Sequence, residues 1–357
     1  TLLACGVFLV TAVAANRHGR LADPSRRDAG TGGYELFAQS TMPIMEDLNT
    51  AAGQDEYALD DLPLANVHFV QMALHEGDDA SCLNLNRVQQ PAVLGVDPDV
   101  FHEARAFTFA ATASGLDKET PWLALEKETT PGTIPAIADQ AVITWGLGKE
   151  IGDTIPYTDA QGRTFHLKLV AGLAGSVFQG YVLVDRSHLL ERYPGISGTR
   201  VMLIDAPPAK TATLAKALTR RLEDAGFAVT PTAERLARFN SVENTYLSIF
   251  LILGGLGVIL GSVGLGVVLM RNVFERRPEL ALLRAMGFER RLVRRIVVIE
   301  HWLLAVGGVC FGLVAGLMAV LPALLSPSSS VPILSLAIMI LALAAACMLW
   351  TVAAANL

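Results

Sequence analysis

The sequence predicts an α-helical membrane protein with four spans and an inserted mixed α/β extracytoplasmic domain. Of its 357 residues, 52% are apolar and 17% are charged, whereas about a quarter of a typical soluble domain is charged. Long uncharged runs lie on both sides of one extended polar region. Near its end, this polar region has the periodicities of strands and of an amphipathic helix, which indicates a folded domain between membrane segments.

Four apolar runs are the expected transmembrane helices: residues 1–16, 246–270, 296–325 and 331–355. The second has 25 uncharged residues and would be about 38 Å long as a helix, enough to cross a hydrocarbon core of about 30 Å. The first could also be a signal sequence, because "LLAC" followed by Gly6 resembles a lipobox. A signal needs a charged start and a longer apolar stretch before Cys5, so we expect a transmembrane helix whose beginning is truncated.

Charge sets the expected orientation. The loop at residues 271–295 has eight arginines and three glutamates, whereas the loop at 326–330 has no basic residue. Because basic loops stay in the cytoplasm, the first loop is predicted to be cytoplasmic and the second external. The polar region, 17–245, is then extracytoplasmic, and four arginines near its start oppose this only weakly. It has 20 Lys/Arg against 30 Asp/Glu, and the protein is expected in the cell membrane.

The end of the polar region predicts a β-α-β unit. "TRVMLIDAP" alternates like a strand, and "FAVTPT" is a second strand. Between them, Leu214, Leu218 and Leu222 share one face of a helix that should end at Gly226. A further helix from about Ala233 is expected to continue into the second span without a break.

The rest of the polar region is predicted in less detail. Two strands flank a turn at Gly162, and "YVLVDRSHLLERYPG" indicates a strand followed by a short helix. Residues 30–130 indicate mixed α/β structure with several loops. Of the four cysteines, only Cys82 lies in this region, so the region cannot form a disulfide from its own residues.

The sequence has no recognisable nucleotide site of its own. "GLGKE" at residues 146–150 lacks the spacing and the Ser/Thr of a phosphate loop, and no G-x-S-x-G elbow is present. The basic loop is too short and too close to the membrane for a nucleic-acid surface. A chain of this kind that uses ATP needs a partner to hydrolyse it, and we expect no cofactor.

Two groups of residues allow alternative interpretations. "HEGDDASCLNLN" at residues 75–86 has metal-binding residue types but no metal-site spacing, so a turn between strands is favoured and no metal site is expected. Glu300 and His301 lie about one turn inside the third span, where they could form a proton relay. Anchoring at the cytoplasmic interface is favoured, because both side chains can reach it.

Glycines four residues apart predict close helix packing in the membrane. One such pair lies in the second span and a double repeat lies in the third: Gly257 and Gly261, then Gly308, Gly312 and Gly316. The packing partner could be within the chain or in a second copy.

Inside the basic loop, the sequence predicts a short capped helix. Pro278 suits the first turn, Glu279 complements the positive end of the helix dipole, and Gly287 suits a left-handed cap. Residues three apart share a face, which gives an apolar stripe of Leu280, Leu283 and Met286. A membrane anchor explains the arginines alone, whereas a docking element for a cytoplasmic partner also explains the apolar stripe.

The stretch "ERRPELALLRAMGFERRLVRRIVVIEHWLLAVGGVCFGLVAGL" resembles the C-terminal region of FtsX-like/MacB-like ABC transporter permeases. The positions of that pattern are occupied by Glu279, Leu280, Ala281, Leu283, Arg284, Ala285, Met286 and Gly287, with Glu300 as the later acidic residue. Ala281 stands where glycine is common, and Pro278 where a polar residue is frequent. The order of one span, a large external domain and three spans also matches, with domains at 1–16, 17–245 and 246–357.

The resemblance implies that the short helix docks on a separate cytoplasmic ABC ATPase, whose motion stiff helices pass to the outer domain. It implies roles for Glu279 in orienting the helix, Leu283 in apolar docking and Arg284 in meeting acidic groups or lipid phosphates. Other implied partners are membrane lipid, a second permease unit (a second copy or a fused half), and a periplasmic adaptor or lipoprotein. No catalytic residue and no nucleic acid are implied.

Two other classes of function stay open. The chain could be a receptor or sensor whose external domain binds a ligand and signals through the cytoplasmic loop. A membrane-anchored enzyme depends only on the cluster at 75–86. The sequence does not define a cargo, because lipoprotein, lipid, peptide, antibiotic or no cargo are all compatible with it.

Overall fold

The computed structural model describes residues 25–78, 88–117, 120–127 and 130–324, together with Cys5, Phe8, Leu9, Val13 and Ala345. Most of the expected first span, the 326–330 loop and almost all of the expected fourth span lie outside these residues, as does Cys82. The chain divides into two compact units. One consists of Arg20–Val242, and the other combines Thr1–Gly19 with Glu243–Leu357.

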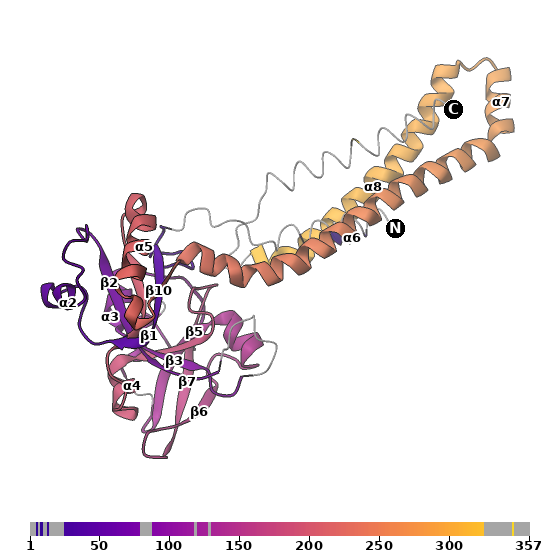
Figure 1. Ribbon diagram of the computed structural model, residues 1–357. Coiled ribbons are helices and arrows are strands. Elements are labelled where there is room, and N and C mark those ends of the chain that lie inside the picture. The colour runs from indigo at the N-terminus through magenta and orange to yellow at the C-terminus, as the bar shows by residue number, and fades with distance from the viewer. Residues whose placement is uncertain are drawn as a thin grey trace. The chain divides into compact units, whose positions relative to one another are not determined.

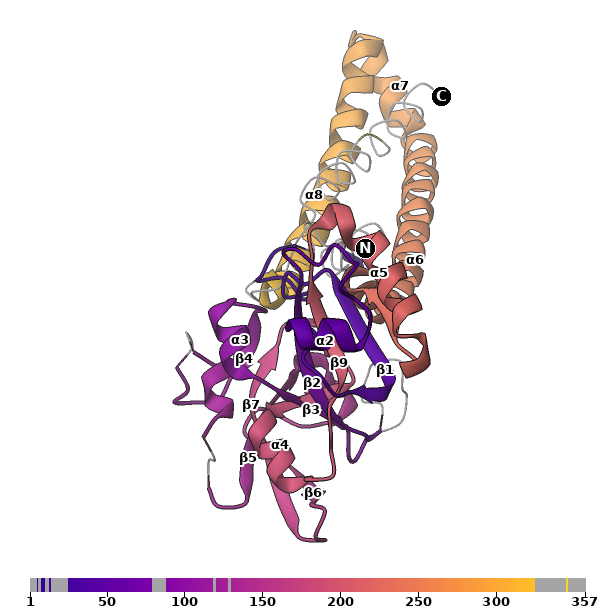
Figure 2. The ribbon, with the colours of Figure 1, turned by 60° about the vertical axis from the view of Figure 1, so that its left-hand side comes forward.

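The first unit, here called the α/β unit, is built on a sheet that has ten strands among the described residues. Its neighbouring strands follow the order β10-β1-β9-β2-β3-β8-β5-β7-β4, and β6 pairs with β7 (Figures 1 and 2). The bounds of the first five strands are β1 Leu36–Ile44, β2 His68–His75, β3 Ala92–Val96, β4 Phe109–Thr112 and β5 Thr133–Asp139. The others are β6 Thr154–Thr158, β7 Thr164–Leu173, β8 Tyr181–Asp185, β9 Thr199–Asp205 and β10 Ala228–Pro231.

Short helices connect these strands. They are α2 Ala51–Glu56, α3 Pro98–Glu103, η1 Trp122–Leu125, η2 Val142–Gly146, α4 Arg186–Arg192, η3 Pro208–Lys210, α5 Thr211–Arg221 and η4 Glu223–Ala225. Several have side-chain caps, which satisfy their first N–H groups. The hydroxyl of Thr50 caps α2, and the carboxylates of Asp97 and Asp185 cap α3 and α4.

The predicted β-α-β unit is confirmed as β9, α5 and β10. Leu214, Leu218 and Leu222 are almost fully buried in one apolar cluster with Leu36 of β1. Gly226 has φ 63°, the left-handed conformation expected where the helical segment ends. In the sheet, β1 lies between β9 and β10 and is antiparallel to both, so β9 and β10 run parallel.

The turn at Gly162 and the strand-helix pair that follows are also confirmed. Gly162 has φ 80° and joins the antiparallel strands β6 and β7. Strand β8 leads directly into α4, and the side chain of Asp185 accepts a hydrogen bond from the Ser187 N–H. Residues 30–130, for which the sequence predicted only mixed α/β structure with several loops, contain β1 to β4. Of these strands, β2 and β3 are neighbours in the middle of the sheet.

A fully buried carboxylate, Asp139, closes the end of β5. Its oxygens accept hydrogen bonds from the N–H of Ala141 (3.0 Å) and the N–H of Ser176 (2.5 Å). Burial raises the pKa of Asp139 to about 6, although these N–H groups and the Ser176 hydroxyl partly offset the increase. Asp139 therefore ties the end of β5 to the loop that connects β7 and β8.

Among the residues of the second unit that the structure describes are three consecutive helices. They are α6 Thr232–Glu275, whose first residues belong to the α/β unit, then α7 Arg277–Ala285 and α8 Arg290–Leu324 (Figure 1). Within α6, Thr245–Asn272 is long and apolar enough to cross a membrane, and α8 contains a shorter apolar stretch, Val306–Gly316. The predicted continuous helix into the second span is confirmed, whereas the arrangement with four spans stays a prediction.

The α6–α7–α8 turn as a candidate docking site

Helix α7 begins where the sequence favours a helix start. It follows α6 after a single residue, Arg276, and Pro278 is its second residue. At this position the missing N–H of proline removes no intrahelical hydrogen bond, and its fixed φ suits the helix. Glu279 lies in the first turn, where its negative charge complements the positive end of the helix dipole.

The end of α7 is a Schellman-type cap. Gly287 has φ 96°, and the N–H of Phe288 donates to the carbonyl of Leu283 at 3.2 Å. The N–H of Met286 donates to the carbonyl of Leu282 at 3.0 Å. The positive φ of Gly287 and the hydrogen bond from Phe288 to Leu283 turn the chain sharply. Helix α7 therefore ends after nine residues.

The exposed apolar surface of α7 differs in part from the predicted stripe. Met286 is 62% exposed, while Leu283 is half-buried. Leu282 is 63% exposed and lies four residues before Met286, so the two share a face. Sequence reasoning missed Leu282, although this spacing could have identified it. The side chains of Leu280 and Arg284 lie outside the described residues.

The charges around α7 are partly engaged with one another. Arg271 and Glu275 form an ion pair at 2.7 Å, four residues apart on the last turns of α6. The guanidinium of Arg277 lies over the ring of Phe274, 4.6 Å from its centroid. These contacts hold the chain where α6 leads into α7. Ala285, the last residue of α7, is exposed.

Glu300 contacts the residue that links α6 to α7. Its carboxylate is 3.1 Å from the Arg276 guanidinium, which joins α8 to the start of the turn. Both side chains are about half exposed, at 56% for Arg276 and 44% for Glu300. This contact favours the anchoring interpretation of Glu300. The side chain of His301 lies outside the described residues.

The glycines predicted to pack lie on the two long helices. Gly257 and Gly261 are in α6, and Gly308, Gly312 and Gly316 are in α8. Three of them, at 261, 312 and 316, are buried in their unit. Their role in association with a second copy stays a prediction.

The described part of the 75–86 cluster is engaged in contacts within the α/β unit. The ring of His75 stacks on Tyr193 with centroids 3.8 Å apart, and burial lowers its pKa. Glu76 forms an ion pair with Arg200. Among the residues that the structure describes, no group of three or more His, Cys, Asp or Glu side chains could hold a metal ion. These contacts favour a structural interpretation of His75 and Glu76.

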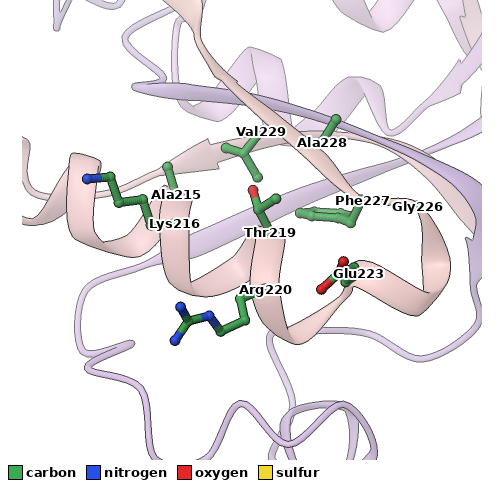
Figure 3. Close-up of a pocket in the computed structure, with 9 residues that line it drawn as sticks. All are labelled: Ala215, Lys216, Thr219, Arg220, Glu223, Gly226, Phe227, Ala228 and Val229. Carbon is green, nitrogen blue, oxygen red and sulfur yellow. The ribbon is translucent and has the colours of Figure 1, made fainter.

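The α/β unit also has a shallow groove of about 590 Å³ between α5 and β10 (Figure 3). Ala215 and Thr219 of α5 lie on the side of Val229, and Lys216 and Arg220 extend away from this strand. The sequence analysis did not identify this groove.

Comparison with known proteins identifies the second unit. Residues 251–357 match the family model of the FtsX-like permease C-terminal domain. An uncharacterized ABC transporter permease of Methanocaldococcus jannaschii is 32% identical over 104 residues, which are 29% of this chain. The chain covers 26% of the length of that relative.

The solved structures that resemble the chain at low similarity include the periplasmic region of MacB from Actinobacillus actinomycetemcomitans, with a TM-score of 0.29 and 9% sequence identity. The match covers 60% of this chain and 95% of that one.

Long helices with apolar stretches, joined by a capped turn, follow the α/β unit. The stretch from residue 251 to residue 357 is similar to FtsX-like permease domains. Helices α7 and α8 lie entirely within it, and α6 lies partly within it.

Proposed function

We propose that the chain is the membrane subunit of an ABC transporter that works with a separate cytoplasmic ATPase. The ATPase docks on α7, and α6 passes its motion to the α/β unit outside the cytoplasm. The single observation that carries the proposal is α7: a nine-residue capped helix, with exposed apolar and basic residues, inside an FtsX-like permease domain. Export or mechanical activation of an envelope partner would follow from this motion.

The charge of the chain supports this orientation. Arginine is concentrated in residues 271–295, whereas residues 17–245 have a net charge of −10. Basic loops stay in the cytoplasm, so α7 is on the side where ATP is available. The protein then lies in the cell membrane in contact with lipid, and the α/β unit is positioned to meet a periplasmic adaptor or lipoprotein.

The proposal assigns a role to several residues of α7. Glu279 orients the helix by stabilising its first turn. Leu283 and the exposed pair Leu282 and Met286 give an apolar surface for the ATPase. Arg284 provides a cation for acidic groups of that partner. ATP binds to the ATPase in this scheme, and the chain contributes no catalytic residue.

The chain acts with a second permease unit in this proposal, as a second copy or as the other half of a longer protein. A dimeric ATPase presents two docking surfaces, which two α7 helices would occupy. Of the five glycines on α6 and α8, Gly257 and Gly308 are only partly buried in their unit, and we propose that the second unit approaches closely there.

The test uses the whole chain in nanodiscs together with a cytoplasmic ABC ATPase from the same organism. Arg284→Glu is expected to reduce stimulation of the ATPase about tenfold, because a repulsive charge replaces an attractive one at the interface. Leu282→Asp should have a similar effect, because it places a carboxylate on the exposed apolar face of α7. Hydrolysis is measured as phosphate release with and without the chain.

Arg291→Glu is the matched control. It makes the same change of charge in the same loop, but at the start of α8 instead of on α7. Equal effects of Arg284→Glu and Arg291→Glu would indicate a general basic patch, and would contradict docking through α7. No stimulation by the unmodified chain with that ATPase would contradict the proposed function and favour a receptor or sensor.

A further inference from the structure

The first turns of α6 are part of the core of the α/β unit. Thr232, Leu236 and Phe239 are 1%, 2% and 6% exposed, and their spacing of four and three places them on one face of the helix. Thr232 fixes the start of α6, because its N–H donates to the carbonyl of Glu35 at 3.0 Å. Its hydroxyl donates to the carbonyl of Tyr34 at 2.5 Å.

Arg235, on the same part of α6, lies among three aromatic rings. Its guanidinium carbon is 3.9 Å from the centroid of Phe37, 5.1 Å from that of Phe239 and 5.8 Å from that of Tyr181. Phe37 belongs to β1 and Tyr181 to β8, which come from opposite halves of the sheet order. One cation on α6 therefore contacts both halves of the sheet.

The same guanidinium is bonded to the loop between β7 and β8. The Nε–H of Arg235 donates to the carbonyl of Val177 at 2.9 Å. This loop is itself firmly held: the N–H of Val177 donates to the carbonyl of Gly30 at 2.9 Å, and Phe178 is fully buried. On its other side, Asp139 accepts the N–H of Ser176. Arg235 thus bonds to a loop that cannot yield without disturbing the core.

We propose that Arg235 is a positioning residue that fastens the first two turns of α6 to the α/β unit. This inference depends on the proposed function for its purpose, which is to prevent the helix from slipping against the domain that it moves. A helix held by apolar packing alone can slide or rotate by small steps. A charged group that needs three rings and one carbonyl in fixed places cannot follow such a step.

An arginine is required here for geometric reasons. Its planar guanidinium can stack on an aromatic face and donate from Nε in a defined direction at the same time. A lysine ammonium keeps the attraction to the rings but is a compact charge without this planar fork. Lysine should therefore replace the function of Arg235 only in part.

The test measures hydrogen exchange of the whole chain in detergent micelles, by mass spectrometry of peptides from residues 232–242. Arg235→Ala should make these amides exchange about tenfold faster, because it removes a partly desolvated cation–π contact and a charge-assisted hydrogen bond. Arg235→Lys should give an intermediate increase, about threefold. Peptides from β1 and β9 should change less than about twofold in both variants.

Arg238→Ala is the matched control, three residues along the same helix. Arg238 forms an exposed ion pair with Glu234 at 2.7 Å, with 65% of its side chain exposed. Such a pair contributes little, so exchange should change less than about twofold. In a double-mutant cycle, Arg235→Ala should have a smaller effect in a Phe37→Leu background, since the principal ring is already gone.

Two results would overturn the proposal. One is an increase in Arg235→Ala no larger than in Arg238→Ala. The other is an equal increase across 232–242, β1 and β9, which would assign Arg235 to general stability. The measurement needs no ATPase, so it distinguishes failure of this inference from failure of the proposed function.

Discussion

The free energy of unfolding of the α/β unit should depend measurably on the protonation of Asp139. The carboxyl group has an ordinary pKa of 3.8, and burial raises this pKa to about 6 in the folded protein. Between these values the folded protein holds a proton that the unfolded chain has lost. The free energy of unfolding should therefore decrease as pH rises through this window.

The size of the effect follows from the difference in pKa. About two pKa units, at 1.36 kcal/mol each, correspond to roughly 3 kcal/mol. This contribution is complete below the unfolded pKa, decreases from about pH 4 to pH 6, and is lost above the folded pKa. Its sign is opposite to that of a carboxylate paired with a cation, which loses stabilisation on acidification.

Asp139→Asn provides the comparison that isolates this effect. The amide cannot titrate, so all other groups contribute equally to the pH dependence of both proteins. Absolute stability will also differ, because the amide nitrogen would face an N–H of Ala141 or Ser176. This offset does not vary with pH, so the prediction concerns the slope alone.

Thermal unfolding of the whole chain in detergent, from pH 4 to pH 7.5, is the assay. Trp122 is buried in the α/β unit, and its fluorescence reports unfolding. The difference in unfolding free energy between wild type and Asp139→Asn should change by about 2 kcal/mol across this range, which begins just above the unfolded pKa. A difference that stays constant with pH would refute the assignment of a raised pKa to Asp139.

Three further predictions concern single side chains. Gly30→Ala should lower the free energy of unfolding of the α/β unit by about 3 kcal/mol, because the new Cβ would lie 1.9 Å from the carbonyl oxygen of Gly175. The loss is detected as a lower Tm. An unchanged Tm would contradict this close approach. Gly287→Ala should weaken the cap of α7 by about 1 kcal/mol, because φ is 96° there, and should speed hydrogen exchange in Arg277–Ala285. Exchange at the wild-type rate would count against the cap. Arg276→Ala should change Tm little, since its exposed pair with Glu300 is worth less than about 1 kcal/mol. A large loss would show that this contact is stronger than its exposure indicates.

Local patterns predicted the elements that depend on neighbours in sequence. The spacing of Leu214, Leu218 and Leu222 predicted α5 and its buried face. Gly226 predicted the end of this helix, and Gly287 predicted a left-handed cap. The continuity of α6 was also predictable, because the chain from Thr232 to Glu275 contains no proline. These features require only periodicity and the conformational freedom of glycine.

Features that depend on distant residues were not predictable in this way. Strand β1 lies between β9 and β10, and no local pattern of Leu36–Ile44 specifies these partners. Arg235 gave no signal in the sequence, because its rings come from separate strands. The pair of Arg276 and Glu300 likewise requires α8 to return past the start of α7. Each of these contacts follows from topology, which one sequence does not reveal.

The short strand β10 also determines how the sheet ends. The N–H of Thr232 donates to Glu35, so alternate residues of the preceding strand direct their N–H groups toward β1. Within β10, whose four residues the structure describes, the N–H of Val229 then faces outward, and Pro231 has none to offer. A strand from another chain would therefore find few free N–H donors at this edge of the sheet. Pro231 therefore limits edge-to-edge pairing of the α/β unit with another chain at this side of the sheet.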